Sequence, residues 1–140
     1  MKTLPTLFFA TGGIFALCGM IWGIQMSASH DHTLAPAHAH LNLIGLVLMS
    51  IFGTFYALSP QAGQSRLAKL HYGLATLSVV VMVPGIVMAI TGRGEALAAS
   101  GSILAITSIA LFIFVVLRHP VGGAARSADD EAAVLPQPAE

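Results

Sequence analysis

Four long apolar segments, separated by short polar connections, dominate the pattern of residues in this chain. They cover about residues 7–26, 37–58, 68–90 and 101–117. A helix needs about 20 apolar residues to cross the roughly 30 Å hydrocarbon core of a bilayer, and each segment is close to that length, the last being the shortest. The pattern predicts an all-α membrane protein with one domain of four transmembrane helices over residues 1–118.

Composition and the placement of charges agree with this prediction. Apolar residues make up 56% of the 140 positions and charged residues only 9%, an imbalance that a soluble domain of this size would not tolerate. Most of the acidic residues follow the fourth segment, in residues 119–140, together with glycine and proline. Because this stretch has little apolar surface to bury, we expect a disordered cytoplasmic tail without a function of its own.

The basic residues predict the orientation of the helices, because cytoplasmic segments of membrane proteins carry an excess of Lys and Arg. With a cytoplasmic N-terminus, an up-down bundle would place only Arg93 outside and five basic residues inside, namely Lys2, Arg66, Lys69, Arg118 and Arg126. We therefore expect both termini in the cytoplasm. The protein would be a multi-pass protein of the bacterial inner membrane, in contact with lipid and not with nucleic acid.

The first segment permits two other interpretations. Ser27-Ala28-Ser29 after an apolar run is typical of a signal-peptide cleavage site, although the run is long for a signal peptide. Leu17-Cys18-Gly19 has part of a lipoprotein pattern, but leucine stands where a small residue is needed. Cys18 is the only cysteine, which excludes an internal disulfide and a cysteine-based metal cluster.

The pair His38-Ala39-His40 at the start of the second segment is the strongest chemical signal in the sequence. Polar groups inside a membrane helix are costly and indicate a functional site by default. Successive helical residues are about 100° apart, so the two imidazoles should point to nearly opposite sides and cannot readily chelate one small ion. Each could instead serve a flat ligand or a neighbouring helix, as axial histidines do in haem proteins.

The second segment has two different faces. One predicted stripe is apolar and suits the face of a porphyrin; it comprises His40, Leu43, Ile44, Val47 and Ile51. The other is small and partly polar and suits the close approach of another helix; it comprises His38, Asn42, Gly45, Met49 and Gly53. The alternative is that both stripes are ordinary packing surfaces and that the histidines only sit at the membrane interface.

Residues 38–60, HAHLNLIGLVLMSIFGTFYALSP, resemble subunit I of the haem-copper oxidase superfamily, nitric oxide reductases in particular. In that family an H-x-H pair ligates a high-spin haem through its first histidine and a low-spin haem through its second. A sequence like H-x-N-L-L on another helix supplies the opposite low-spin ligand. This chain merges both patterns. The resemblance implies that His40 binds a low-spin haem b, that His38 is the candidate ligand of a second haem, and that Asn42 belongs to the same cofactor-binding motif.

The resemblance also implies an assembly. The large subunit of the family contains three four-helix units with approximate threefold symmetry, and its low-spin haem lies between the second helices of two units. This chain resembles one such unit, so another copy could supply the missing ligand. We expect a homo-oligomer, with a trimer favoured over a dimer. Arg93 resembles by position the arginines that pair with haem propionates, and quinol or cytochrome c would be the electron donor.

The family's site of oxygen or nitric oxide reduction has no evident counterpart here. The sequence contains no adjacent His-His pair and no H-P-E or H-P-x-x-Y motif, so whether the chain is an oxidoreductase stays open. His71 begins the third segment at the opposite end from His40, with roughly 27 Å of helix between the two ends. It is either an interfacial histidine or a ligand of a second haem near the inner face.

Three functions follow as hypotheses. The leading one is a membrane b-type cytochrome for electron transfer or diatomic-gas chemistry. A second is an outer-face copper or zinc site, since imidazole suits both metals; its ligands would be His30, Asp31, His32 and His38. The third is an accessory or assembly subunit of a respiratory complex that holds no cofactor.

Overall fold

The computed structural model describes residues 3–119 and 121, and the regular structure in these residues is helical throughout. The helices are α1 (Leu4–Ser29), α2 (Ala35–His40), the π-helix η1 (Leu41–Leu48), α3 (Met49–Leu58), α4 (Pro60–Gly63), α5 (Arg66–Ile90) and α6 (Ala96–Arg118). Because α2, η1 and α3 run on as one rod, which we call the second span, the described residues hold four helices long and apolar enough to cross a membrane. The four predicted spanning helices are confirmed. The predicted disordered tail lies outside the described residues, apart from positions 119 and 121.

Local sequence signals mark where the helices begin and end. Proline, whose missing N–H does no harm in a first helical turn, opens α1, α2 and α4, as Pro5, Pro36 and Pro60. The hydroxyl of Ser65 accepts a hydrogen bond from the backbone N–H of Ala68 at 3.1 Å and so caps α5. α1 ends at Ser29, and the next residue, His30, has a φ of 55°, in the left-handed region typical of a helix end.

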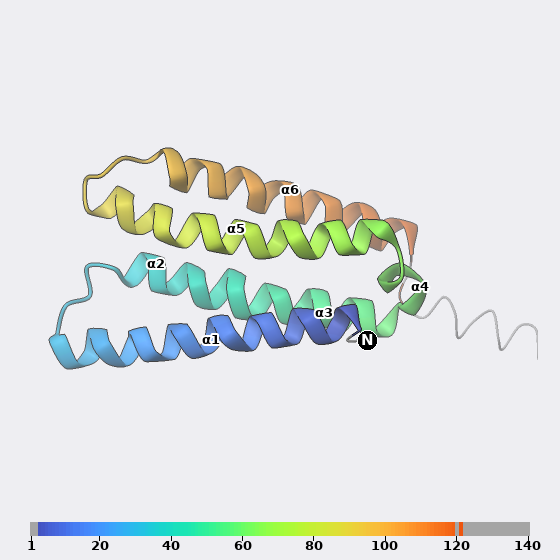
Figure 1. Ribbon diagram of the computed structural model, residues 1–140, viewed down its shortest axis with the longest axis horizontal. Coiled ribbons are helices and arrows are strands. Elements are labelled where there is room, and N and C mark those ends of the chain that lie inside the picture. The colour runs from blue at the N-terminus through green and yellow to red at the C-terminus, as the bar shows by residue number, and fades with distance from the viewer. Residues whose placement is uncertain (1–2, 120, 122–140) are drawn as a thin grey trace, which may run out of the picture.

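The four long helices form two hairpins (Figure 1). α1 lies beside the second span, and α5 lies beside α6. The connection between α1 and α2 and the connection between α5 and α6 lie at the same end of the molecule, whereas the N-terminus and α4 lie at the other. Arg93 lies in the connection between α5 and α6, at the same end of the molecule as the connection that carries His30 and His32. Arg66 and Arg118 lie at the end with the N-terminus.

Glycines let the second hairpin close tightly. A Cβ atom added at Gly101 of α6 would lie 2.5 Å from Cα of Met82 in α5, and one added at Gly85 of α5 would collide with the backbone of Ala98 in α6. Helices in a membrane gain no hydrophobic driving force against each other, so this backbone approach and its dispersion contacts hold α5 to α6.

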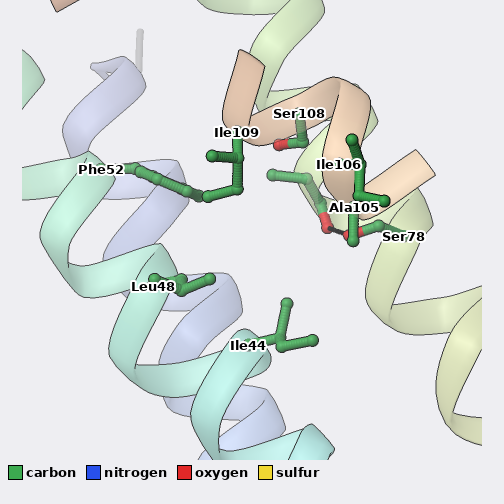
Figure 2. A pocket seen from close by; sticks show the side chains of 9 residues that line it. Ile44, Leu48, Phe52, Ser78, Ala105, Ile106, Ser108 and Ile109 are labelled. Carbon is green, nitrogen blue, oxygen red and sulfur yellow. Dashed lines mark hydrogen bonds between the residues drawn. The ribbon is translucent and has the colours of Figure 1, made fainter. Parts of the chain in front are cut away.

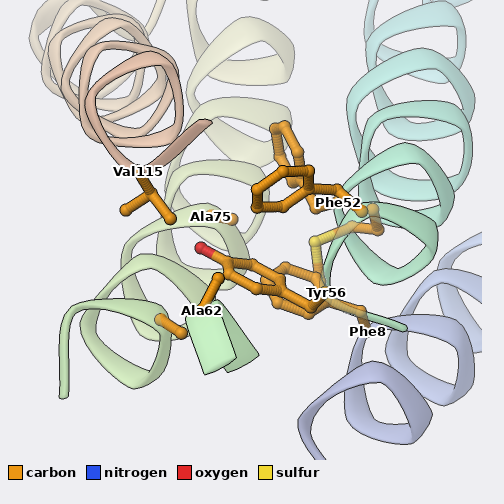
Figure 3. Packing of buried hydrophobic residues seen from close by; sticks show 9 residues of the cluster. Phe8, Phe52, Tyr56, Ala62, Ala75 and Val115 are labelled. Atoms are coloured by element: carbon orange, nitrogen blue, oxygen red, sulfur yellow. The ribbon is translucent and has the colours of Figure 1, made fainter. Parts of the chain in front are cut away.

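The two hairpins contact each other where α2 lies against α5, and again through side chains near the α4 end. Halfway along they leave a cavity of about 300 Å³, lined by Ile44, Leu48 and Phe52 of the second span and by side chains of α5 and α6 (Figure 2). Nearer to α4, an aromatic cluster joins the hairpins (Figure 3). Phe8, Phe52 and Tyr56 are almost fully buried there, packed with Ala75 and Val115. All four long helices contribute to this cluster, which is the core of the fold.

The glycine contact gives a stability prediction. Gly101→Ala should lower the free energy of unfolding by about 1–3 kcal/mol, because the new methyl group would force the backbones of α5 and α6 apart. Gly73→Ala in α5 is the control: a Cβ there meets nothing within 4 Å, so it should be neutral or slightly stabilising. Thermal unfolding in mild detergent measures both. Equal stability of the two variants would show that α5 and α6 do not depend on this contact.

Candidate functional site

The backbone changes its geometry directly after the two histidines. η1 is a π-helix of 8 residues that begins at Leu41, immediately after His40. π-helical turns are rare and occur frequently at functional sites. They also widen the helix, so that residues after His40 do not keep the angular positions that regular α-helical spacing predicts. No residue pattern in the sequence announced this change.

One hydrogen bond orients the ring of His40. Its Nδ1 atom lies 2.8 Å from the carbonyl oxygen of Pro36, one helical turn earlier. A carbonyl oxygen can only accept, so Nδ1–H donates, and in the neutral ring Nε2 keeps its lone pair. The His40 side chain is exposed on the surface of the bundle. Metal-ligating histidines are commonly oriented in this way, by a carbonyl group that binds the other ring nitrogen.

The surface that follows His40 along the second span is apolar, and no helix of the described residues covers it. Leu43, Val47 and Ile51 are 58%, 44% and 49% exposed, and follow His40 along the second span. Ile44, which we predicted on the same stripe, instead turns towards the cavity between the hairpins (Figure 2). The exposed surface of His40, Leu43, Val47 and Ile51 is called the His40 face below.

His38 and Asn42 lie on the other side, against α1. The Asn42 side-chain amide donates to the carbonyl oxygen of His38 at 2.9 Å, and its nitrogen lies 3.2 Å from Nε2 of the same histidine. The His38 ring meets Trp22 of α1 edge-on at 6.3 Å between ring centroids. A Cβ at Gly23 of α1 would lie 3.2 Å from the ring. The predicted divergence of the two histidines is confirmed, and His38 is partly enclosed within the first hairpin.

The small stripe packs against α1, so the predicted close approach of another helix is confirmed, with a helix of the same chain. Gly45 lies against Phe15 of α1, since an added Cβ would come within 2.8 Å of that side chain, and Gly53 lies in the same way against Phe8. Met49, the largest side chain of the stripe, is fully buried. α1 takes this surface because a short loop tethers it there, and closing a short loop costs far less entropy than bringing in a second molecule.

The remaining groups at this end lie on the connecting loops. Asp31 accepts a hydrogen bond from the backbone N–H of Thr33 at 2.9 Å, and hydrogen bonding from Thr33 lowers the pKa of its carboxyl group. His30, His32 and Arg93 are exposed. Among residues 3–119 and 121, no three His, Cys, Asp or Glu side chains are placed to share one metal ion. The structure thus does not bring together the four residues that we expected to hold copper or zinc.

His71 is enclosed in the aromatic cluster at the opposite end of the bundle. It is 0% exposed, and its Nδ1 atom lies 3.0 Å from the hydroxyl oxygen of Tyr56. The rings of Phe52 and Phe112 lie 4.5 Å and 5.5 Å from its own ring, and Phe8 lies at 5.6 Å. Its Nε2 atom has no hydrogen-bond partner among the described residues.

The His71 side chain is enclosed by the bundle, and its position at the membrane interface stays a prediction. Its role as a second haem ligand stays a prediction, with Nε2 as the ligating atom. Sequence reasoning missed Tyr56 as its partner because the two residues belong to different helices, α3 and α5, on either side of the α4 turn. The one available signal was that both are polar residues within apolar segments.

Comparison with protein family models, with curated proteins and with solved structures finds no match for this chain. The likeness of residues 38–60 to haem-copper oxidases thus stands on its motif alone. A functional proposal has to rest on the geometry of the side chains described above.

The buried pair gives a second stability prediction. Tyr56→Phe should lower the free energy of unfolding by about 1–3 kcal/mol, because it leaves both ring nitrogens of His71 without a partner in an apolar cluster. Removing both polar groups, in Tyr56→Phe with His71→Leu, should recover part of that loss. Thermal unfolding in detergent measures the series. An additive or larger loss in the double variant would contradict the idea that the unpaired imidazole causes the damage.

Proposed function

We propose that this chain is a membrane-embedded b-type haem protein in which Nε2 of His40 is an axial ligand to the iron. The observation that carries the proposal is the hydrogen bond between His40 Nδ1 and the Pro36 carbonyl oxygen, 2.8 Å long, on an exposed imidazole. It favours the tautomer with a free Nε2 lone pair and limits rotation of the ring. Metal binding needs both a free lone pair on the ligating nitrogen and a fixed direction for it.

A porphyrin fits this surface better than a bare ion. A bare copper or zinc ion needs about three or four protein ligands, and the described residues contain no group of three His, Cys, Asp or Glu side chains placed to share one ion. A haem brings four equatorial nitrogens of its own and asks the protein only for axial ligands and for apolar contact. Leu43, Val47 and Ile51 offer that contact directly below His40.

The chain supplies one axial ligand on this face, and we propose that a second copy supplies the other. His38 cannot complete the same iron, because it lies against α1 and Asn42 on the opposite side of the span. Two His40 faces brought together would enclose one flat ligand between chains. The His40 face is the proposed contact between copies, since α1 already covers the small stripe. We propose a homotrimer of twelve helices, as the resemblance implies, with a dimer as the alternative.

The proposed chemistry is electron transfer or the binding of a diatomic gas. A bound haem b would supply the reversible one-electron chemistry of its iron. His40 would hold and orient that iron, and the apolar His40 face would exclude water from it. Arg93 lies at the same end of the molecule, and we propose that it pairs with the propionate groups of the haem. Quinol or cytochrome c is proposed as the electron donor.

The orientation is also a proposal, and it rests on charge. Arg66, Lys69 and Arg118 lie at the end that holds the N-terminus, and among the described basic residues only Arg93 lies at the end that holds His38 and His40. By the positive-inside rule the His40 end faces outward, in the inner membrane of a bacterium. Reporter domains inserted at residues 31–33 and fused after Glu140 should report opposite compartments, with the C-terminus in the cytoplasm. A periplasmic C-terminus would overturn the orientation.

The ligand assignment predicts a specific loss. His40→Ala should remove most of the haem from the protein purified in detergent, because neither Leu41 nor Leu43 can replace an iron ligand. Asn42→Leu should be milder, since it removes neutral hydrogen bonds worth about 1 kcal/mol each. Absorbance spectra of oxidised and reduced protein measure haem content and coordination. Loop variant His32→Ala is the matched control and should leave the spectrum unchanged.

The variant His38→Ala tests whether the second axial ligand is His38 of the same chain or a histidine of another copy. We expect it to keep a six-coordinate spectrum, because His38 faces α1. Native mass spectrometry of the same sample should then show haem only in oligomers. A normal spectrum in His40→Ala, or a haem-loaded monomer that keeps two axial histidines, would contradict the proposal.

A further inference from the structure

A groove lies at the α4 end of the molecule, between the beginning of α1 and the turn around α4. It has a volume of about 440 Å³ and a mostly apolar lining that includes Leu4, Pro5, Tyr56, Ala57, Pro60 and Gln64. An engineered apolar cavity of about 150 Å³ already binds benzene, so the groove has room for a short apolar stretch of peptide. Because Tyr56 belongs to its wall, the occupant of the groove contacts the residue whose hydroxyl bonds to His71.

The same end of the molecule carries positive charge that the described residues do not balance. Arg66 and Lys69 lie in the first turn of α5, and Arg118 is the last residue of α6. The acidic residues among positions 3–119 and 121 are Asp31 and Glu95, and both lie in connections at the opposite end. One exposed ion pair contributes little, but several together contribute measurably. An acidic segment at the α4 end would thus meet three cations and no carboxylate of the described residues.

The C-terminal sequence of the chain has the matching pattern. Residues 127–140, SADDEAAVLPQPAE, contain four acidic residues and no basic one. The acidic run Asp129-Asp130-Glu131 is followed by Val134-Leu135, the only branched apolar residues after Val121. An acidic run next to an apolar pair is complementary to a basic surface next to an apolar groove. The sequence alone predicted no role for this stretch, because the groove and the surrounding charges become visible only in the folded chain.

The length of chain after α6 is also suitable. α6 ends at the same end of the molecule as α4 and the N-terminus (Figure 1), and Val134 follows Arg118 by 16 residues. A flexible linker of that length spans roughly 20–24 Å, whereas two interhelical spacings, the width of a four-helix bundle, amount to about 16–20 Å. When the length of a tether matches the span, the effective concentration of its end reaches the millimolar range. Neither a second copy nor a lipid has this advantage.

We propose that residues 129–136 dock on the α4 end of their own chain. Val134 and Leu135 enter the groove and pack against Tyr56, and the acidic run pairs with the basic side chains of α5 and α6. The docked segment covers one wall of the aromatic cluster that holds the Tyr56–His71 pair. The proposal does not rest on a haem, because the groove and His40 lie at opposite ends of the second span.

Single thiols in a Cys18→Ser background test whether the groove is covered. Gln64 lines the groove, and Gln61, which is exposed and does not line it, is the matched control. In full-length Gln64→Cys protein in phosphatidylcholine nanodiscs, adding Leu135→Asp should speed the reaction with a water-soluble maleimide roughly three- to tenfold, because a charge cannot stay in an apolar groove. The rate in Gln61→Cys protein should not change. Ala139→Asp adds the same charge beyond the apolar pair and should change neither rate.

Disulfide formation shows which chain fills the groove. Protein with Gln64→Cys and Ala133→Cys should crosslink within the monomer roughly tenfold faster than protein with Gln61→Cys and Ala133→Cys. Neutralising the acidic run, in Asp129→Asn with Asp130→Asn and Glu131→Gln, should slow this crosslink roughly three- to tenfold. Raising the salt from about 0.1 M to about 1 M should also slow it, because the Debye length falls from about 10 Å to about 3 Å.

Three results would overturn the proposal. A maleimide rate at position 64 that ignores Leu135→Asp would mean that lipid or water fills the groove. A crosslinked dimer in place of a crosslinked monomer would assign the groove to a second copy. Equal crosslinking from positions 61 and 64 would show that the segment visits this end of the molecule without docking there. Each result can be read from protein without haem, so it leaves the assignment of His40 untouched.

Discussion

The packing of α1 against the second span determines which side chains of that span are buried and which stay exposed. Glycines at positions 45 and 53 let the two helices approach until Phe15 and Phe8 lie against the backbone. This contact covers one side of the second span and takes His38 and Asn42 with it. Because residues two apart diverge on a helix, the same contact turns His40 outward. One packing interaction thus gives two neighbouring histidines different surroundings.

The aromatic cluster has the complementary role of joining the two hairpins. Phe8, Phe52, Tyr56 and His71 come from α1, α3 and α5, and Phe112 reaches them from α6. A polar pair in such surroundings costs free energy unless both groups are satisfied, and here the Tyr56 hydroxyl satisfies one nitrogen of His71 and leaves the other open. The hairpins are therefore joined near α4 by aromatic rings, and at the other end by α2 packed against α5. Midway along they are separated by the cavity.

Two features could be predicted from the sequence, because they depend only on the length of the apolar runs and on the angle between successive helical residues. Apolar runs of sufficient length predicted the four helices, and a 100° step predicted that His38 and His40 diverge. The sequence could not tell which of the two stripes faces inward, because Leu43 and Val47 suit lipid as well as they suit a protein core. It could not reveal the π-helix after His40. Nor could it pair Tyr56 with His71, since that contact depends on how two helices rotate against each other about the α4 turn.

The exposed position of His40 leaves one of its ring nitrogens facing the lipid when the protein is in a membrane. The residue lies five positions after Ala35, so it stands about 7.5 Å along the span, near the boundary of the hydrocarbon core. One of its nitrogens is already engaged with Pro36, and the other faces outward over apolar side chains. In lipid, an acceptor at this position has to find a partner or bear the cost of leaving water. The described residues offer none on that face, so a ligand or a second copy beside His40 would remove this cost.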